Sequence, residues 1–137
     1  MKIAVIDGLG GGLGSQIVDK LNRRLKQEVT IVALGTNAIA TSKMLENGAD
    51  EGATGENAVC VNLDKVDLVI GPLGLIIPNS MKGEITTAMA EAIAGSQAKK
   101  VIIGMKQPHV DLVGLNERSL NELIDDALLR VEKLLEG

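Results

Sequence analysis

Five glycines stand within seven residues near the start of the chain, directly after an apolar run that ends at Ile6. Glycine allows positive φ angles and lets a ligand approach the backbone without a Cβ in the way. A helix that starts after these glycines directs unpaired N–H groups and its positive dipole end at the same place. The stretch therefore predicts binding of an anionic, phosphate-bearing group. The residues expected to contact this group are Gly8, Gly10, Gly11, Gly12, Leu13 and Gly14.

A tight strand-to-helix turn is the alternative interpretation of these glycines. Each glycine costs roughly 0.5–1 kcal/mol relative to alanine in regular structure, and five are more than a turn needs. The spacing does not match the strict dinucleotide fingerprint, because Leu13 occupies its last glycine position when counted from Gly8. The arrangement Gly-x-x-x-Gly-x-Gly at Gly8, Gly12 and Gly14 instead resembles the nucleotide loop of short-chain dehydrogenases.

The residues after the expected second strand depart from that resemblance. The acid that usually binds a ribose hydroxyl should lie about 20 residues beyond the glycines. Thr36 and Asn37 stand there instead, and both side chains can hydrogen-bond a sugar or a phosphate. The chain contains no tyrosine, so the Tyr–Lys chemistry of short-chain dehydrogenases is excluded.

A second glycine- and proline-containing stretch, residues 71–80, follows the expected strand 67–70 at its carboxyl end. Short-chain dehydrogenases place a similar turn against the nucleotide, so we expect a ligand wall here rather than a plain loop. Its apolar residues 75–77 are expected to be exposed, as a lid or an oligomer contact. The expected ligand contacts in this stretch are Gly71, Pro72, Gly74, Asn79 and Ser80.

Residues 48–57 are polar and glycine-rich, and they lead into an expected strand at Ala58–Val61. Ligands of open parallel sheets bind beyond the carboxyl ends of strands, whereas this stretch would lie at an amino end. A solvated connection and a ligand contact through Glu56 and Asn57 therefore both remain open.

Single side chains that could react or bind a metal give weaker evidence for a site than the glycine-rich stretch does. Asp7 is expected to accept hydrogen bonds from loop amides. The alternative interpretation is that Asp7 binds Mg²⁺ together with Glu51, Glu56 and Glu84, but no fixed spacing of these acids supports it. His109, the only histidine, is expected to be a satisfied or solvated side chain and not a base. Cys60 is expected to be buried in a strand and unreactive. No metal site is predicted.

Short β-branched runs alternate with helical patterns along the whole chain, which is typical of a parallel sheet covered by helices. We expect one Rossmann-like α/β domain over residues 1–137, a three-layer sandwich with five to six mostly parallel strands and helices on both faces. Strands are expected at 2–6, 30–34, 58–61, 67–70 and 100–103, with 110–113 as an edge strand. Helices are expected from residue 13, from Thr36 or Asn37 to Gly48, over 83–95, and after Ser119.

The last helix has the clearest start signal, because Ser119 and Glu122 form a capping box. Its expected buried stripe consists of Leu120, Leu123, Ala127, Val131 and Leu134.

Composition excludes several partners. Acidic residues outnumber basic ones by 18 to 14, and no Phe, Tyr or Trp is present to stack on bases, so a nucleic-acid surface is not expected. No signal peptide or membrane span is recognisable, so we expect a soluble, cytoplasmic protein without membrane contact. Hydrophobic residues make up 45% of this small chain, which favours a homo-oligomer.

Four blocks of sequence resemble a family of small bacterial proteins known as domain of unknown function 3842. They are Val5–Gly8 with its glycine run, Ala33–Thr41, Gly52–Ala58 and Asn79–Thr86. The resemblance implies a compact Rossmann-like fold and transfers no catalytic residue. From the residues, the leading hypothesis is a protein that binds a nucleotide or another phosphate-bearing ligand. A small Mg²⁺-dependent hydrolase or transferase using Asp7, and a non-catalytic subunit of a larger complex, are the alternatives.

Overall fold

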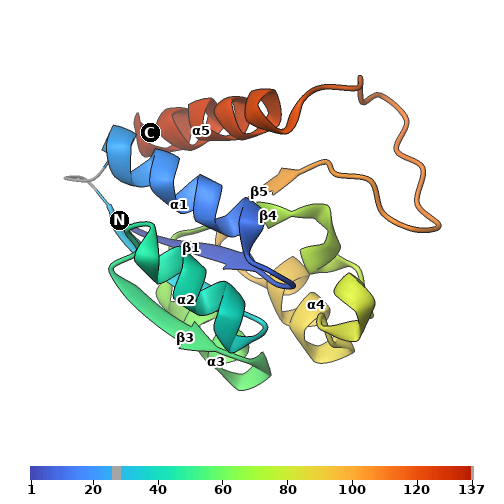
Figure 1. Ribbon diagram of the computed structural model, residues 1–137, viewed down its shortest axis with the longest axis horizontal. Helices are drawn as coiled ribbons and strands as arrows, with labels where there is room; N and C mark the ends of the chain where they lie inside the picture. The colour runs from blue at the N-terminus through green and yellow to red at the C-terminus, as the bar shows by residue number, and fades with distance from the viewer. Residues whose placement is uncertain (26–28, 137) are drawn as a thin grey trace.

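The computed structural model describes residues 1–25 and 29–136, which form a sheet of five strands enclosed by helices (Figure 1). The strands are β1 (Lys2–Asp7), β2 (Thr30–Gly35), β3 (Glu51–Thr54), β4 (Leu68–Pro72) and β5 (Lys99–Ile103). The α-helices are α1 (Gly12–Leu25), α2 (Ala38–Glu46), α3 (Glu56–Asn62), α4 (Thr87–Gly95) and α5 (Leu120–Glu136). Short 3₁₀ turns occupy Leu63–Lys65, Leu73–Ile76 and Met81–Gly83. The predicted Rossmann-like α/β fold is confirmed.

All strand pairs are parallel, in the order β3-β2-β1-β4-β5. The chain winds outward from β1 to β3, then returns to the other side of β1 for β4 and β5. This reversal places the carboxyl ends of β1 and β4 side by side at the switch point, where ligands of open α/β sheets usually bind. The glycine-rich loop that follows β1 lies at this edge.

Alternation along β1 explains why both faces of the sheet are covered. Ile3 and Val5 pack into one core with α1 and α5, whereas Ala4 and Ile6 pack into a second core with α3 and α4. The side chains of both cores are aliphatic or methionine, since the chain has no aromatic residue. A strand buried on both faces is therefore apolar throughout, as the sequence predicted for β1.

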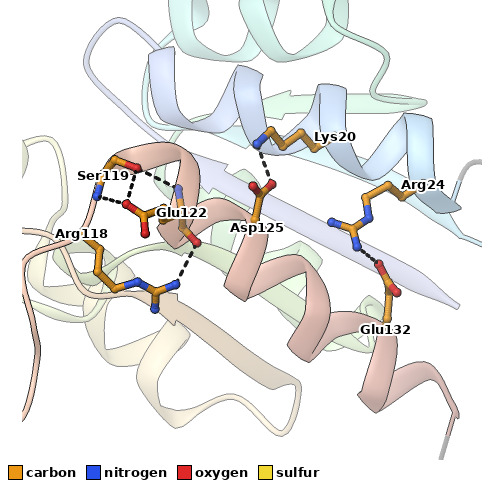
Figure 2. A network of polar contacts seen from close by, with 7 residues as sticks. All are labelled: Lys20, Arg24, Arg118, Ser119, Glu122, Asp125 and Glu132. Atoms are coloured by element: carbon orange, nitrogen blue, oxygen red, sulfur yellow. Dashed lines mark hydrogen bonds and ion pairs between the residues drawn. The ribbon is translucent and has the colours of Figure 1, made fainter.

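α5 lies beside α1 and is joined to it by ion pairs (Figure 2). Lys20 Nζ lies 2.7 Å from Asp125 Oδ1, and Arg24 Nη2 lies 2.7 Å from Glu132 Oε1. The predicted capping box is confirmed at the start of α5. The predicted stripe is only partly correct, because Leu134 is exposed and Ile124 and Leu128 are buried instead.

The expected strand at Ala58–Val61 is wrong, because these residues belong to α3 and only Val59 among them is fully buried. The third strand is instead Glu51–Thr54, which the sequence analysis assigned to a connection. β3 is an edge strand with three exposed residues, so it carries no apolar run that could have predicted it.

Two further expectations need correction. The helix predicted over 83–95 begins at Thr87, after Thr86 caps it by accepting from the Met89 N–H. Val110–Val113 forms no strand in this sheet, and only an isolated antiparallel bridge joins Gln107 to Val110. Among the described helices, none is long and apolar enough to cross a membrane.

Candidate functional site

Three strands end together at the carboxyl edge of the sheet. Asp7 at the end of β1 is in register with Gly35 of β2, and Gly35 is in register with Thr54 of β3. Residues 55–57 therefore lie beyond a carboxyl end, and not at an amino end as predicted, because the strand precedes them. The loops after β1, β2 and β3 all start from this edge.

Three glycines of the loop after β1 are needed for packing. A Cβ on Gly8 would lie 2.5 Å from Thr36 Oγ1, and one on Gly14 would lie 2.7 Å from the Asp7 Cβ. Gly11 has φ +73°, and its Cβ would lie 2.8 Å from the Ala40 backbone. These contacts support the turn interpretation for Gly8, Gly11 and Gly14.

Gly10 and Gly12 are different, because a Cβ on either would meet nothing within 4 Å. Both are exposed, and Gly12 is the first residue of α1. Among the described residues, the N–H groups of Gly10, Gly12 and Leu13 donate to no protein acceptor. The start of α1 thus presents free donors and the positive end of the helix dipole on an open surface.

The Glu84 carboxylate lies against this loop and joins it to the loop after β2. Its Oε1 accepts from the Leu9 N–H at 2.9 Å, from Thr36 Oγ1 at 2.5 Å and from Asn37 Nδ2 at 2.8 Å. These hydrogen bonds, that from Thr36 foremost, hold the pKa of Glu84 below its usual value. Among the described residues, no donor is bonded to Oε2.

Leu9 is held in a left-handed conformation with φ 51°. Its N–H donates to Glu84, and its carbonyl accepts from Asn37 Nδ2 at 2.9 Å. Asn37, one of the two residues predicted to cap α2, accepts from the Ala40 N–H. Two polar side chains therefore fix a backbone conformation that leucine rarely adopts.

Asp7 stabilises the glycine-rich loop from the buried end of β1. The side chain is only 5% exposed, and its Oδ2 accepts from the Gly14 N–H at 2.6 Å. Burial raises the pKa of Asp7 despite this hydrogen bond, and the Glu84 charge adds to the increase. The prediction that Asp7 bonds to loop amides is confirmed.

The stretch after β4 is more tightly packed than expected. A Cβ on Gly71 would lie 2.5 Å from the Ile6 carbonyl oxygen, and the Ser80 hydroxyl donates to the Gly74 carbonyl. Leu75 is fully buried, so the expected exposed patch at 75–77 is wrong: Leu75 belongs to the second core. Pro72 is buried at the end of β4, and Asn79 is exposed with φ 66°. The 3₁₀ turn Met81–Gly83 follows this stretch and leads to Glu84.

Glu56 and Asn57 lie in the first turn of α3. Glu56 Oε1 accepts from Thr86 Oγ1 at 2.5 Å, which links this turn to the N-terminus of α4, while Asn57 is exposed. Glu51 lies at the amino end of β3 and pairs with Lys2, away from Asp7. Within the described ranges, no three His, Cys, Asp or Glu residues are grouped as a metal site.

Cys60 and His109 lie apart from this edge. Cys60 is partly exposed on α3 rather than buried in a strand, and burial together with the Glu56 charge raises the pKa of its thiol. His109 is exposed in the segment after β5, as expected. Two cavities of about 770 and 1110 Å³ also lie near that segment, and neither is lined by the glycine-rich loop.

The sequence has no carboxylate directly after β2, but the structure brings Glu84 to that place. It reaches Thr36 across 48 residues of sequence, from a different loop. The only signal for it was its inclusion among acids that could accompany Asp7. Proximity in the fold, and not spacing along the chain, brings it to the glycine-rich loop.

Comparison with solved structures finds the same architecture in a protein of very different sequence. A dodecameric FMN-dependent UbiX-like decarboxylase from Escherichia coli O157:H7 superposes with a TM-score of 0.53 at 12% identity, over 100% of this chain and 96% of the other. No curated protein matches the sequence significantly. The model of the family described as domain of unknown function DUF3842 matches residues 2–136, so this chain belongs to that family.

Proposed function

We propose that this chain binds a phosphate-bearing small molecule at the open side of the glycine-rich loop. The preferred ligand in this proposal is a nucleotide. The observation that carries the proposal is the set of free N–H groups at Gly10, Gly12 and Leu13, with no Cβ obstructing the glycines. Backbone donors at a helix N-terminus are a common anion site. Gly8, Gly11 and Gly14 act as its support, since packing explains them fully.

Glu84 provides the preference for a nucleotide over a simple anion. Its Oε2 is free to accept from a ligand hydroxyl, while Oε1 stays bonded to Thr36 and Asn37 at the end of β2. That is the region where dinucleotide-binding proteins place an acid for the ribose. The arrangement suits a ligand with a phosphate on the loop and a sugar hydroxyl at Glu84.

The direct test is a thermal-shift panel of AMP, ATP, NAD, FMN and inorganic phosphate. FMN is included because the protein with the similar fold is described as FMN-dependent. A ligand at 100 times its Kd adds about 2.7 kcal/mol to the free energy of unfolding. No shift with any member of the panel would contradict the proposal.

Gly12→Asp separates binding from folding. The new carboxylate sits at the exposed start of α1, where it favours the helix but competes for the free amides. We expect unchanged or higher stability and loss of ligand binding. Thr87→Asp introduces the same carboxylate at the exposed first residue of α4 and should leave binding unchanged. Equal binding by Gly12→Asp and wild type would place the ligand elsewhere.

The role of Glu84 is tested with AMP and its 2′,3′-dideoxy analogue. One hydrogen bond to a charged acceptor predicts a preference for AMP of about tenfold or more. Glu84→Ala should bind both compounds equally. If the wild type also binds both equally, Glu84 does not contact a sugar.

We also propose that the chain forms a homo-oligomer. Several large apolar side chains of the described residues are exposed close together in sequence, among them Leu112, Val113 and Leu115. Contiguous exposed apolar surface marks interaction sites. The protein of similar fold is described as a dodecamer, which is consistent with this proposal. Light scattering after size exclusion tests it, and a monomer at tens of micromolar would contradict it.

A further inference from the structure

Residues 104–119 form an arm that leaves the body after β5 and returns to it at α5 (Figure 1). Every residue from Pro108 to Ser119 is exposed, and Val113 is completely so. From Asp111 to Glu117, no hydrogen bond joins the arm to the rest of the described chain. A segment of this kind gains little by staying in place on its own subunit.

The arm nevertheless has the sequence of a strand. Val110, Leu112 and Val113 are large apolar residues with the strand-forming valine twice among four positions, which is why an edge strand was predicted there. The sheet of the same subunit does not include Val110–Val113, because among the described residues β5 pairs with β4 alone. The strand-forming tendency of the arm is therefore unused within one subunit.

The other side of β5 offers an acceptor for such a strand. Among the described residues no strand covers it, so its backbone groups form an open sheet edge. A cavity of about 770 Å³ lies between β5 and α5, lined in part by Leu123, Leu134, Arg130 and Lys133. Gly114, Leu115 and Asn116 of the same subunit's arm line its other side. A sheet edge next to an apolar and basic groove suits an apolar strand that carries an acid.

The side-chain pattern of the arm matches that of the edge. On β5, Val101 and Ile103 face α5, so Lys99 is on that face too and the partly exposed Ile102 is on the opposite face. In an added strand, Asp111 and Val113 would share one face and Leu112 would lie on the other. In a parallel addition with Asp111 opposite Lys99, Val113 lies opposite Val101 on the groove side. Leu112 then lies opposite Lys100 on the other face, next to Ile102.

We propose that Val110–Val113 of one copy adds as a strand to the β5 edge of a second copy, in a reciprocal exchange. The partner is a second copy because the chain itself carries both halves of the match, the acidic apolar arm and the basic apolar edge. A two-fold pair satisfies both arms and both edges at once. This inference rests on the proposed homo-oligomer and names its contact surface.

Light scattering and sedimentation of three variants test the exchange. Leu112→Pro removes the N–H needed for strand pairing, and Val113→Lys places a charge among Arg130 and Lys133. Each should weaken association by about tenfold or more. Ile39→Lys, an equally drastic change at an exposed position of α2, should not. Because the arm is exposed, all variants should keep the wild-type circular dichroism and melting temperature at a concentration where the wild type is monomeric.

Charge reversal identifies the specific contact. Asp111→Lys should weaken association, and adding Lys99→Asp should restore it at least in part. Wild-type association by Leu112→Pro and Val113→Lys would overturn the arm exchange and leave the homo-oligomer proposal standing. A wild-type chain that is monomeric up to the highest soluble concentration would overturn both.

Discussion

Removing the Glu84 carboxylate should loosen the contact between the glycine-rich loop and the loop after β2. Glu84→Ala takes the acceptor away from three donors, the Leu9 N–H, the Thr36 hydroxyl and the Asn37 amide. It also leaves the left-handed conformation of Leu9 with support from Asn37 alone. Glu84→Gln keeps an acceptor oxygen at the same distance and loses only the charge.

Hydrogen bonds to charged groups contribute roughly 1.5–3 kcal/mol when buried, and neutral ones roughly 0.5–1.5. Water can reach this half-exposed site, so the three donors are partly satisfied after the substitution. We therefore expect Glu84→Ala to lower the free energy of unfolding by about 1–2 kcal/mol and the melting temperature by roughly 3–8 °C. Glu84→Gln should lose less than half as much.

The pH dependence of this effect has a defined sign. The folded-state pKa of Glu84 lies below its ordinary value of 4.5, so its stabilisation is complete above pH 4.5 and is lost as the pH falls through the lower, folded-state pKa. Urea unfolding of wild type and Glu84→Gln should differ at pH 6 and converge as the pH is lowered. An Ala variant within 1 °C of wild type at pH 7, where about 3 °C or more is expected, would refute the assignment of Glu84 as the link between the two loops.

Three other substitutions probe the loop and the last helix. Gly11→Ala should cost about 2–4 kcal/mol, because a left-handed alanine is strained and its Cβ meets Ala40, whereas Gly10→Ala should be within about 0.5 kcal/mol of wild type in urea unfolding. The free energy of unfolding of Asp7→Asn should rise relative to that of wild type as the pH increases from 3.8 through the raised folded-state pKa of Asp7. The reason is that ionisation of the buried carboxyl destabilises only the wild type. Parallel profiles of stability against pH would contradict this. Ser119→Ala should lower the free energy of unfolding by about 1 kcal/mol through loss of the α5 cap, and unchanged thermal unfolding would show that the cap adds nothing.

The parts of the fold that the sequence predicted are those in which burial dictates residue type. β1, β2 and β4 are buried on both faces, so they appear as apolar runs. β3 escaped prediction because an edge strand with exposed side chains needs no apolar residue. The apolar run Ala58–Val61 was mistaken for it, since a short run of that kind suits a strand and a helix equally well.

The candidate site was predictable only where it is local in sequence. The glycines lie next to the start of α1, and Asn37 caps α2 through an N–H three residues along the chain, so each of these features acts locally. Glu84 was not predictable in its role, because its three donors come from two other loops. The sequence also could not separate Gly10 and Gly12 from Gly11, since the difference is what a Cβ would meet in space.

Backbone amide chemical shifts measured during a titration with AMP and FMN test the central claim most directly. The chain is small enough for each N–H to be followed individually. A ligand held by the free donors should cause saturable shifts that are largest at Gly10, Gly12 and Leu13, with smaller changes at Leu9 next to Glu84. Shifts confined to other surfaces, or no saturable shift at these three amides with either compound, would contradict nucleotide binding by the glycine-rich loop.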